Sequence, residues 1–182
     1  MIGSVVALGG PPGSGKSTAG RLVARQLGLE YRSVGEEFRA QAKLRGLDLE
    51  AFGRYAEQHP EVDRELDRRM QALARPGVIL DGRIQGALCR RNGIPVVAIV
   101  VTASPAERAR RLSGRDRQSV EAAAKAIEVR EASERSRYLR FYGIDVDREP
   151  ADLLVDSTTR TPEEVAAAIV QFLRDRSVGE SP

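Results

Sequence analysis

The sequence predicts an α/β fold in which a five-stranded parallel sheet is covered by helices on both faces. Short apolar, β-branched runs recur along the chain, and segments with helical spacing separate them. The strongest runs are continuously apolar, which is typical of strands buried on both faces of a sheet. Because strands that alternate with helices are joined by right-handed crossovers, we expect the strands to be parallel.

Four apolar runs are the expected strands of this sheet, and a weaker fifth run completes it. The first run ends in Gly9, and Asp81 and Asp156 close two of the others. The expected strands are residues 4–9, 31–34, 78–81, 95–101 and 153–156, of which 31–34 is the weak one.

Helical spacing fills the intervals between the runs, and several helix starts carry their own signals. Asp48 and Ser119 can cap the helices that follow them. Thr161, Pro162 and Glu164 combine an N-cap hydroxyl, a proline at the first helical position and the glutamate of a capping box. The expected helices are residues 16–27, 36–44, 50–57, 61–74, 85–91, 105–112, 120–141 and 162–174.

The length of 182 residues favours a single domain, residues 1–182. Its core comprises residues 1–34, 76–112 and 143–176. Residues 35–75 form a charged helical insertion, and residues 113–142 contain a polar, arginine-rich break at 113–119 followed by the longest helix. Insertions at the carboxyl end of a parallel sheet are where ligands bind and lids move. We expect residues 177–182 to be a disordered tail.

Composition excludes several classes of protein. The 29 Lys and Arg residues exceed the 26 Asp and Glu residues by three, too small an excess to indicate a nucleic-acid surface. Cys89 and His59 are single, so they cannot form an internal disulfide or a His/Cys metal cage. The first residues carry no basic leader, and no apolar run reaches about 18 residues. We therefore expect a cytoplasmic protein that does not associate with membranes.

The strongest motif is the stretch GPPGSGKS at residues 10–17, which satisfies G-x-x-x-x-G-K-[ST] between a buried strand and a helix. Backbone N–H groups of such a loop, together with the helix N-terminus, bind phosphates. The Lys16 ammonium would reach the β- and γ-phosphates, and the Ser17 hydroxyl would complete a Mg²⁺ shell. The residues expected to bind ATP are Gly10, Pro11, Pro12, Gly13, Ser14, Gly15, Lys16, Ser17 and Thr18.

Asp81 is the second candidate for the metal. It ends an expected strand, which places its carboxylate at the edge of the sheet near the phosphate loop. There it can orient Mg²⁺ through the water shell, together with Ser17. A cap for the segment that begins at Gly82 is the alternative, and the two roles are compatible.

Two classes of phosphate-loop protein are disfavoured by missing residues. A GTP switch needs Asn-Lys-x-Asp, but the only asparagine is Asn92, which Gly93 follows. A protein kinase needs His-Arg-Asp, but Pro60 follows the only histidine. A small kinase or ATPase remains, with an acceptor bound by the inserted helices and by arginines. An acceptor phosphate is ionised at neutral pH, so it needs positioning and charge neutralisation rather than a general base.

Five stretches in this order resemble the archaeal-type cytidylate kinases, which are nucleoside monophosphate kinases. They are the phosphate loop, residues 33–39, residues 52–69, the turn at residues 81–83 and the helix at residues 130–142. The resemblance covers residues 5 to about 173. It implies a P-loop kinase fold in which residues 35–75 bind the monophosphate, with a short lid.

The same resemblance implies roles for particular residues. Those that would bind the acceptor monophosphate are Ser33, Gly35, Arg39 and Arg83, with Arg39 as the clamp on its phosphate. Those that would be catalytic at the transferred phosphoryl group are Lys16, Arg115, Arg130 and Arg137. Residues 130 and 137 lie about 20° apart around a helix, with Glu134 on the same face. For each arginine outside the loop, a solvated surface charge is the alternative.

We therefore expect a kinase that transfers the γ-phosphoryl group of ATP, with Mg²⁺, to CMP or dCMP and releases ADP and CDP or dCDP. Its partners are these small nucleotides, and we expect a monomer with no stable nucleic-acid partner. Two alternatives stay open: another small-acceptor kinase such as adenylate kinase, and a nucleotide-dependent assembly or regulatory ATPase. A kinase should be stimulated by one monophosphate, whereas an assembly ATPase should respond to a macromolecule.

Overall fold

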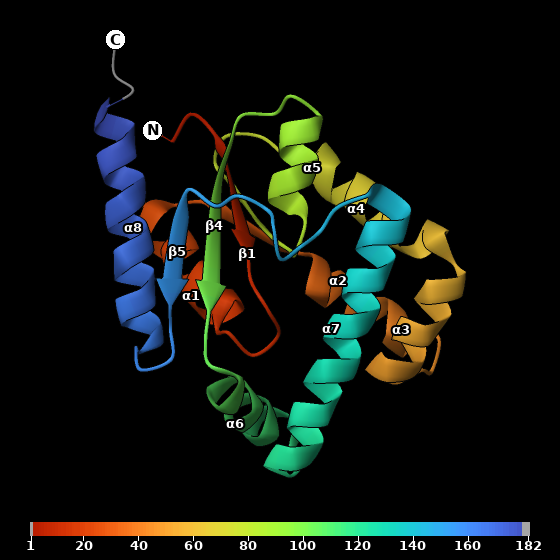
Figure 1. Ribbon diagram of the computed structural model, residues 1–182. Coiled ribbons are helices and arrows are strands. Elements are labelled where there is room, and N and C mark those ends of the chain that lie inside the picture. Colours follow the sequence, from red (N-terminus) through yellow and green to blue (C-terminus); the bar gives the residue numbers. More distant parts are fainter. Residues whose placement is uncertain (1, 180–182) are drawn as a thin grey trace.

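Five strands form one parallel sheet in the order β2-β3-β1-β4-β5 in the computed structural model, which describes residues 2–179 (Figure 1). The five-stranded α/β class predicted from the sequence is thereby confirmed. The weak run of the sequence is a true strand at the edge of the sheet. The strands are β1 (Val5–Gly9), β2 (Glu30–Ser33), β3 (Val78–Asp81), β4 (Val96–Thr102) and β5 (Leu153–Asp156).

Eight helices connect and extend the strands within the described residues, and each corresponds to a segment with helical spacing. Asp48, Ser119 and Thr161 cap their helices as expected, and Glu164 Oε2 accepts from the Thr161 backbone N–H at 2.7 Å. The helices are α1 (Lys16–Leu27), α2 (Val34–Leu44), α3 (Leu49–Gln58), α4 (Pro60–Ala72), α5 (Gln85–Arg91), α6 (Pro105–Asp116), α7 (Val120–Tyr142) and α8 (Pro162–Gly179).

The sheet is the middle of three layers because successive side chains point to opposite faces. Val6 and Leu8 pack on one face against α1 and α8, whereas Val5, Val78 and Leu80 pack on the other against α4 and α5. Figure 1 shows α8 and α1 on one side of the strands and α5 and α4 on the other. Burial on both faces explains why the strand runs are apolar without alternation.

The insertion between β2 and β3 has a hydrophobic core of its own. Phe52 and Leu66 are fully buried there, and Phe38 packs against them. The rings of Phe38 and Phe52 lie 4.5 Å apart between their centroids. Helix α7 crosses from this insertion to α6, where Leu112 and Ile127 form a further cluster. The insertion and α7 thus border the carboxyl edge of the sheet.

Most boundaries agree with those expected to within two residues, and two differ by more. Helix α6 continues through Asp116, so the polar break is shorter than residues 113–119. Polar side chains alone do not end a helix, and the single Gly114 costs only about 1 kcal/mol. The helix ends at Arg117, whose φ of 53° is left-handed. Helix α8 includes residues 177–179, which were expected in the tail, and residues 180–182 lie outside the described part. No helix within residues 2–179 is long and apolar enough to span a membrane.

Candidate active site

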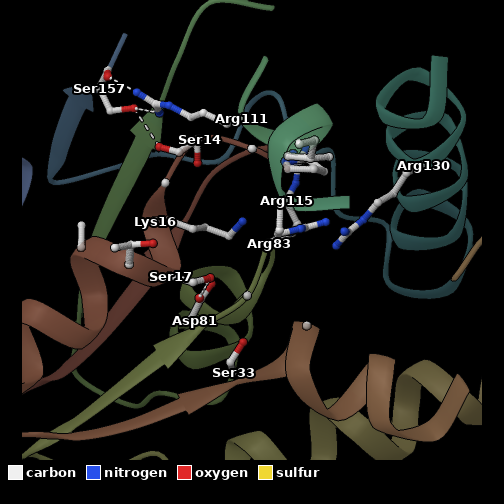
Figure 2. Close-up of a pocket in the computed structure, with 18 of the residues that line it drawn as sticks. Ser14, Lys16, Ser17, Ser33, Asp81, Arg83, Arg111, Arg115, Arg130 and Ser157 are labelled. Carbon is white, nitrogen blue, oxygen red and sulfur yellow. Dashed lines mark hydrogen bonds between the residues drawn. The ribbon is translucent and has the colours of Figure 1, made fainter. Parts of the chain in front are cut away.

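A cavity of about 850 Å³ opens at the carboxyl edge of the sheet, between the phosphate loop, α2, α6 and α7. Figure 2 shows side chains from these elements pointing into it. It is lined by every expected site residue except two at the start of the phosphate loop, Gly10 and Pro11. Residues separated by more than 100 positions in the sequence therefore meet at one site.

Gly10 packs the phosphate loop against the sheet. Its φ is 132°, and a Cβ atom there would lie 2.1 Å from the carbonyl oxygen of Val101 on β4. Gly13 and Gly15 also have left-handed φ values, 80° and 81°. Only glycine takes such conformations without strain, so these residues let the loop curl over the start of α1. The helix N-terminus then points its free N–H groups at the cavity.

Lys16 lies at the first position of α1 and points from the loop into the cavity (Figure 2). Its Nζ atom donates to the carbonyl oxygen of Pro11 at 3.4 Å. Burial lowers the pKa of the ammonium, Asp81 opposes this shift, and Arg130 adds to it. The charge is thus held without a full partner, as a group that receives an anionic phosphate requires.

Ser17 and Asp81 meet below Lys16. The Ser17 hydroxyl donates to Asp81 Oδ2 at 2.6 Å, and the Tyr31 hydroxyl donates to the same oxygen. Tyr31 lies on β2, beside β3, where the register pairs it with Ile79, two residues before Asp81. No cluster of three or more His, Cys, Asp or Glu side chains suited to a metal occurs among residues 2–179. An oxygen pair of this kind fits Mg²⁺, which commonly takes one or two protein ligands beside phosphates and water.

Arginines from other elements also line the cavity, and those expected there include Arg39, Arg83, Arg115 and Arg130. Burial lowers the pKa of the Arg39 guanidinium, and the charges of Arg130 and Arg115 lower it further. Arg39 lies over the start of α2, since a Cβ atom at Gly35 would be 3.5 Å from its Nη1 and 3.8 Å from Ser33 Oγ. This mutual repulsion marks the cavity as a site for an anion.

Carboxylates hold part of this cluster in place. Glu134 Oε1 accepts from Arg130 Nε at 2.7 Å, and its other oxygen lies 3.8 Å from Arg83 Nε. Burial acts to raise the pKa of Glu134, but Arg130 and Arg83 outweigh burial and the pKa falls below its usual value. Asp116 pairs with Arg115 in the same way at 2.7 Å. The alternative of freely solvated charges therefore does not describe Arg83 and Arg130, which are largely buried.

Arg137 is placed differently from Arg130, although the two share a face of α7. It is 4% exposed and pairs with Asp63 of α4, and its guanidinium carbon lies 5.4 Å from the Phe38 ring centroid. Besides burial, the charges of Arg130 and Arg83 lower the pKa of the Lys16 ammonium. The structure thus brings Arg130 toward the phosphate loop and Arg137 toward the insertion.

Several contributors have no motif that would reveal them. Arg108 donates to the carbonyl oxygen of Pro12 at 3.4 Å and pairs with Glu131 of α7 at 2.8 Å. Arg111 donates to Ser157 Oγ at 2.9 Å, and Ser157 donates to the carbonyl oxygen of Ser14 at 2.8 Å (Figure 2). These bonds tie α6 and the end of β5 to the phosphate loop.

Asp63 carried a usable signal in the sequence. Together with Asp67, it sits directly beside the apolar stripe of α4 formed by Val62, Leu66 and Met70. Two carboxylates next to a buried stripe, one turn apart, indicate groups that need partners from other elements.

The fold, the glycine loop and the Lys16, Ser17 and Asp81 cluster define a P-loop nucleotide-binding protein. A family model described as an AAA domain matches residues 6–138. The shikimate kinase of Acinetobacter baumannii, solved with shikimate, superposes with a TM-score of 0.61 at 18% identity, covering 95% of this chain and 94% of its own. The shikimate kinase of Aquifex aeolicus gives a TM-score of 0.54 at 18% identity, with 96% and 99% covered. At these identities the likeness concerns the fold.

Curated relatives identify the family within this class of P-loop proteins. The cytidylate kinase of Methanocaldococcus jannaschii is 38% identical over 157 residues, which are 85% of this chain and 88% of the relative. The cytidylate kinase of Pyrococcus horikoshii is 38% identical over 167 residues, 91% of this chain and 85% of the relative. The chain therefore belongs to the cytidylate kinase family, and the family expected from the sequence is confirmed.

Proposed function

We propose that this protein transfers the γ-phosphoryl group of ATP to CMP or dCMP. The observation that carries the proposal is one cavity with a phosphate loop at one end, an inserted helical region at the other and arginines between them. Membership of the cytidylate kinase family over most of the chain supports the choice of acceptor. Transfer between two bound phosphates needs positioning and neutralisation of charge, and this cavity offers both.

The donor end would hold ATP through residues 10–18, whose backbone N–H groups at the non-proline positions can donate to the phosphates, with Lys16 at the β- and γ-phosphates. Ser17 and Asp81 would hold Mg²⁺, which when bound supplies charge neutralisation at the phosphate oxygens. Before nucleotide binds, Ser17 and Tyr31 keep the Asp81 carboxylate aimed at the cavity. This pre-orientation spares the site a rearrangement during the reaction.

The acceptor end would hold the monophosphate through Ser33, Gly35, Arg39 and Arg83. Arg39 is held above the N-terminus of α2, where backbone N–H groups and a guanidinium can share one phosphate. The absence of a side chain at Gly35 leaves space for this approach. The acceptor oxygen is already ionised, so no side chain is needed to remove a proton.

Arg115 and Arg130 would act on the phosphoryl group in transit, because both line the cavity and their charges reach Arg39, and the charge of Arg130 also reaches Lys16. Their carboxylate partners, Asp116 and Glu134, hold the guanidinium groups ready. The catalytic role expected for Arg137 from the sequence would require it to leave Asp63, to which it is bonded here.

A coupled ADP-release assay with ATP and a panel of CMP, dCMP, UMP, AMP, GMP and no acceptor tests the proposal. We expect kcat/KM for CMP and dCMP to exceed that for AMP or GMP by about tenfold or more, since a hydrogen-bonding pocket easily supplies the 1.4 kcal/mol involved. Omitting Mg²⁺ should abolish turnover.

The panel also separates the alternatives. A purine preference would replace the cytidylate assignment with another small-acceptor kinase. Turnover that responds to added RNA or protein and to no monophosphate would indicate an assembly or regulatory ATPase. The cytoplasmic location, the monomeric state and the absence of a nucleic-acid partner stay predictions from the sequence, and size-exclusion chromatography tests the second of them.

A further inference from the structure

A buried ion pair forms part of the wall of the cavity in the acceptor half. Asp63 of α4 and Arg137 of α7 are 5% and 4% exposed, and both line the cavity. A single guanidinium nitrogen, Nη1, donates to both carboxylate oxygens, with 2.5 Å to Oδ2. Arginine normally binds a carboxylate with two parallel N–H bonds, so this pair uses less than its full capacity.

The unused capacity is visible on both partners. Arg137 Nε is buried and has no hydrogen-bond partner among the described residues. The two oxygens of Asp63 share that single Nη1 donor, so the carboxylate has one donor atom for both of its oxygens. Buried polar groups are nearly always satisfied, so an unpaired one on a cavity wall calls for a partner such as a ligand or water.

Asp67 provides an internal comparison one turn further along α4. It is as buried as Asp63, but it accepts from Tyr142 Oη and from Gln85 Nε2, each at 2.7 Å, and it does not line the cavity. The same helix thus holds one aspartate whose neighbours complete it and one that faces the cavity with an incomplete partner. The difference points to a ligand at Asp63.

The pair presents a hydrogen-bond acceptor beside a hydrogen-bond donor, in a part of the cavity also bordered by the rings of Phe38 and Tyr138. Cytosine carries an amino donor at C4 next to the acceptor N3, whereas uracil carries an acceptor at C4 next to a donor at N3. Carboxylates accept from the cytosine amino group, and aromatic rings pack against flat bases.

Resting on the proposed function, we propose that Asp63 and Arg137 read the base of the acceptor. Asp63 accepts from the 4-amino group, and Arg137 donates to N3. The pair selects the amino edge of cytosine over the keto edge of uracil. Adenine offers the same order of donor and acceptor, so discrimination against AMP must come from the space available to the ring.

The first experiment changes only the substrate of the wild-type enzyme. The acceptors are CMP, UMP and pyrimidin-2-one ribonucleoside 5′-monophosphate, which lacks the 4-amino group. Loss of a base contact of this kind costs about 1–3 kcal/mol, so kcat/KM should fall by roughly 5- to 150-fold from CMP to the analogue. Equal kcat/KM for CMP and the analogue would overturn the proposal without any variant.

The second experiment changes the protein by Asp63→Asn, with Asp67→Asn as the matched control on the same helix. Asp63→Asn should lower kcat/KM for CMP by about tenfold or more and leave kcat/KM for the 4-deamino analogue nearly unaffected. The analogue already lacks the amino group, so removing the carboxylate removes no further interaction, as in a double-mutant cycle. Asp67→Asn should keep the wild-type ratio of CMP to the analogue, whatever its effect on thermal stability.

A uniform loss in Asp63→Asn, equal for CMP, UMP and the analogue, would overturn the proposal, because the pair would then only support the fold or the phosphates. Arg137→Met separates the two roles again. If Arg137 reads the base, this substitution lowers the preference for CMP over UMP. If its charge acts on the phosphoryl group, the substitution lowers kcat for every acceptor. A wild-type enzyme that phosphorylates no monophosphate would refute the proposed function itself. Should Asp63→Asn fail to fold, the analogue series and Arg137→Met still decide.

Discussion

The two halves of the cavity are built in different ways. The donor half consists of consecutive residues, 10–18, whose conformation depends on glycines with left-handed φ values and on backbone packing against β4. The acceptor half is assembled from side chains of α2, α4, α7 and the turn after β3, and its ion pairs include two between residues far apart in the sequence. Backbone groups can thus bind the part of a ligand that many enzymes share. A part that differs between enzymes is recognised by side chains, which can change without disturbing the loop.

Glycine substitutions test this contrast and should give the largest effect. In Gly10→Ala the new Cβ atom would lie 2.1 Å from the Val101 carbonyl oxygen, and the alanine would have to adopt a positive φ. Neither the clash nor the strain can be relieved by turning a side chain, because both involve backbone atoms. We expect a loss of more than about 4 kcal/mol in the free energy of unfolding, or no folded protein. Urea denaturation followed by circular dichroism measures it.

Gly35→Ala is the counterpart in the acceptor half. Its Cβ atom would meet the flexible end of Arg39 at 3.5 Å and the Ser33 hydroxyl at 3.8 Å, and the residue lies within α2. Its stability should be unchanged or higher by up to about 1 kcal/mol, because alanine favours a helix. Equal destabilisation by Gly10→Ala and Gly35→Ala would contradict the difference between the two halves of the cavity.

Lys16→Ala should have the next largest effect, on turnover rather than folding. We expect kcat to fall by about 10² or more, because the ammonium charge stabilises the phosphoryl group in transit. The fall should be the same for CMP and UMP, since the donor half does not contact the acceptor base. Steady-state kinetics measure it, with Lys43→Ala on the exposed side of α2 as the control. A fall that depends on the acceptor would place Lys16 outside the donor half.

Arg39→Met should have the smallest effect of the three, confined to the acceptor. The KM for CMP should rise by about tenfold or more with little change in the KM for ATP, because a clamp on the resting phosphate acts in both ground and transition states. Arg68→Met is the control, since Arg68 lies in the same insertion with a side chain that is 77% exposed and a surface ion pair. A wild-type KM for CMP in Arg39→Met would leave this arginine as a solvated charge.

Local signals predicted the donor half closely. Residues 16–27 were expected as a helix and form one, and Ser17 and Asp81 meet as expected, because strand, loop and helix are adjacent in sequence and the sheet edge aligns β1 with β3. The family resemblance, and not these local signals, assigned Arg83 and Arg130 to the site, and it did not give their shared partner Glu134 as the group that holds them.

The acceptor half was less accessible to such reasoning. The partner of Arg137, Asp63, is 74 residues away in the sequence, and Tyr31 is 50 residues from the Asp81 that it contacts. Helical spacing says which residues share a face, whereas only the packing of α7 against the insertion says which charge that face meets. For this reason the expected alignment of Arg130 and Arg137 on α7 did not reveal that they point to different partners.

The bonds of Arg108 have a consequence for how the two nucleotides would bind. Arg108 connects the Pro12 carbonyl oxygen of the phosphate loop to Glu131 on α7, and α7 also carries Arg130 and Arg137. A ligand that shifts the loop therefore acts, through α6, on the helix that borders the other ligand. By thermodynamic linkage, the factor by which the donor changes the affinity for the acceptor is also the factor by which the acceptor changes the affinity for the donor. We therefore expect binding at the two ends to be coupled through Arg108, which is buried behind the cavity wall.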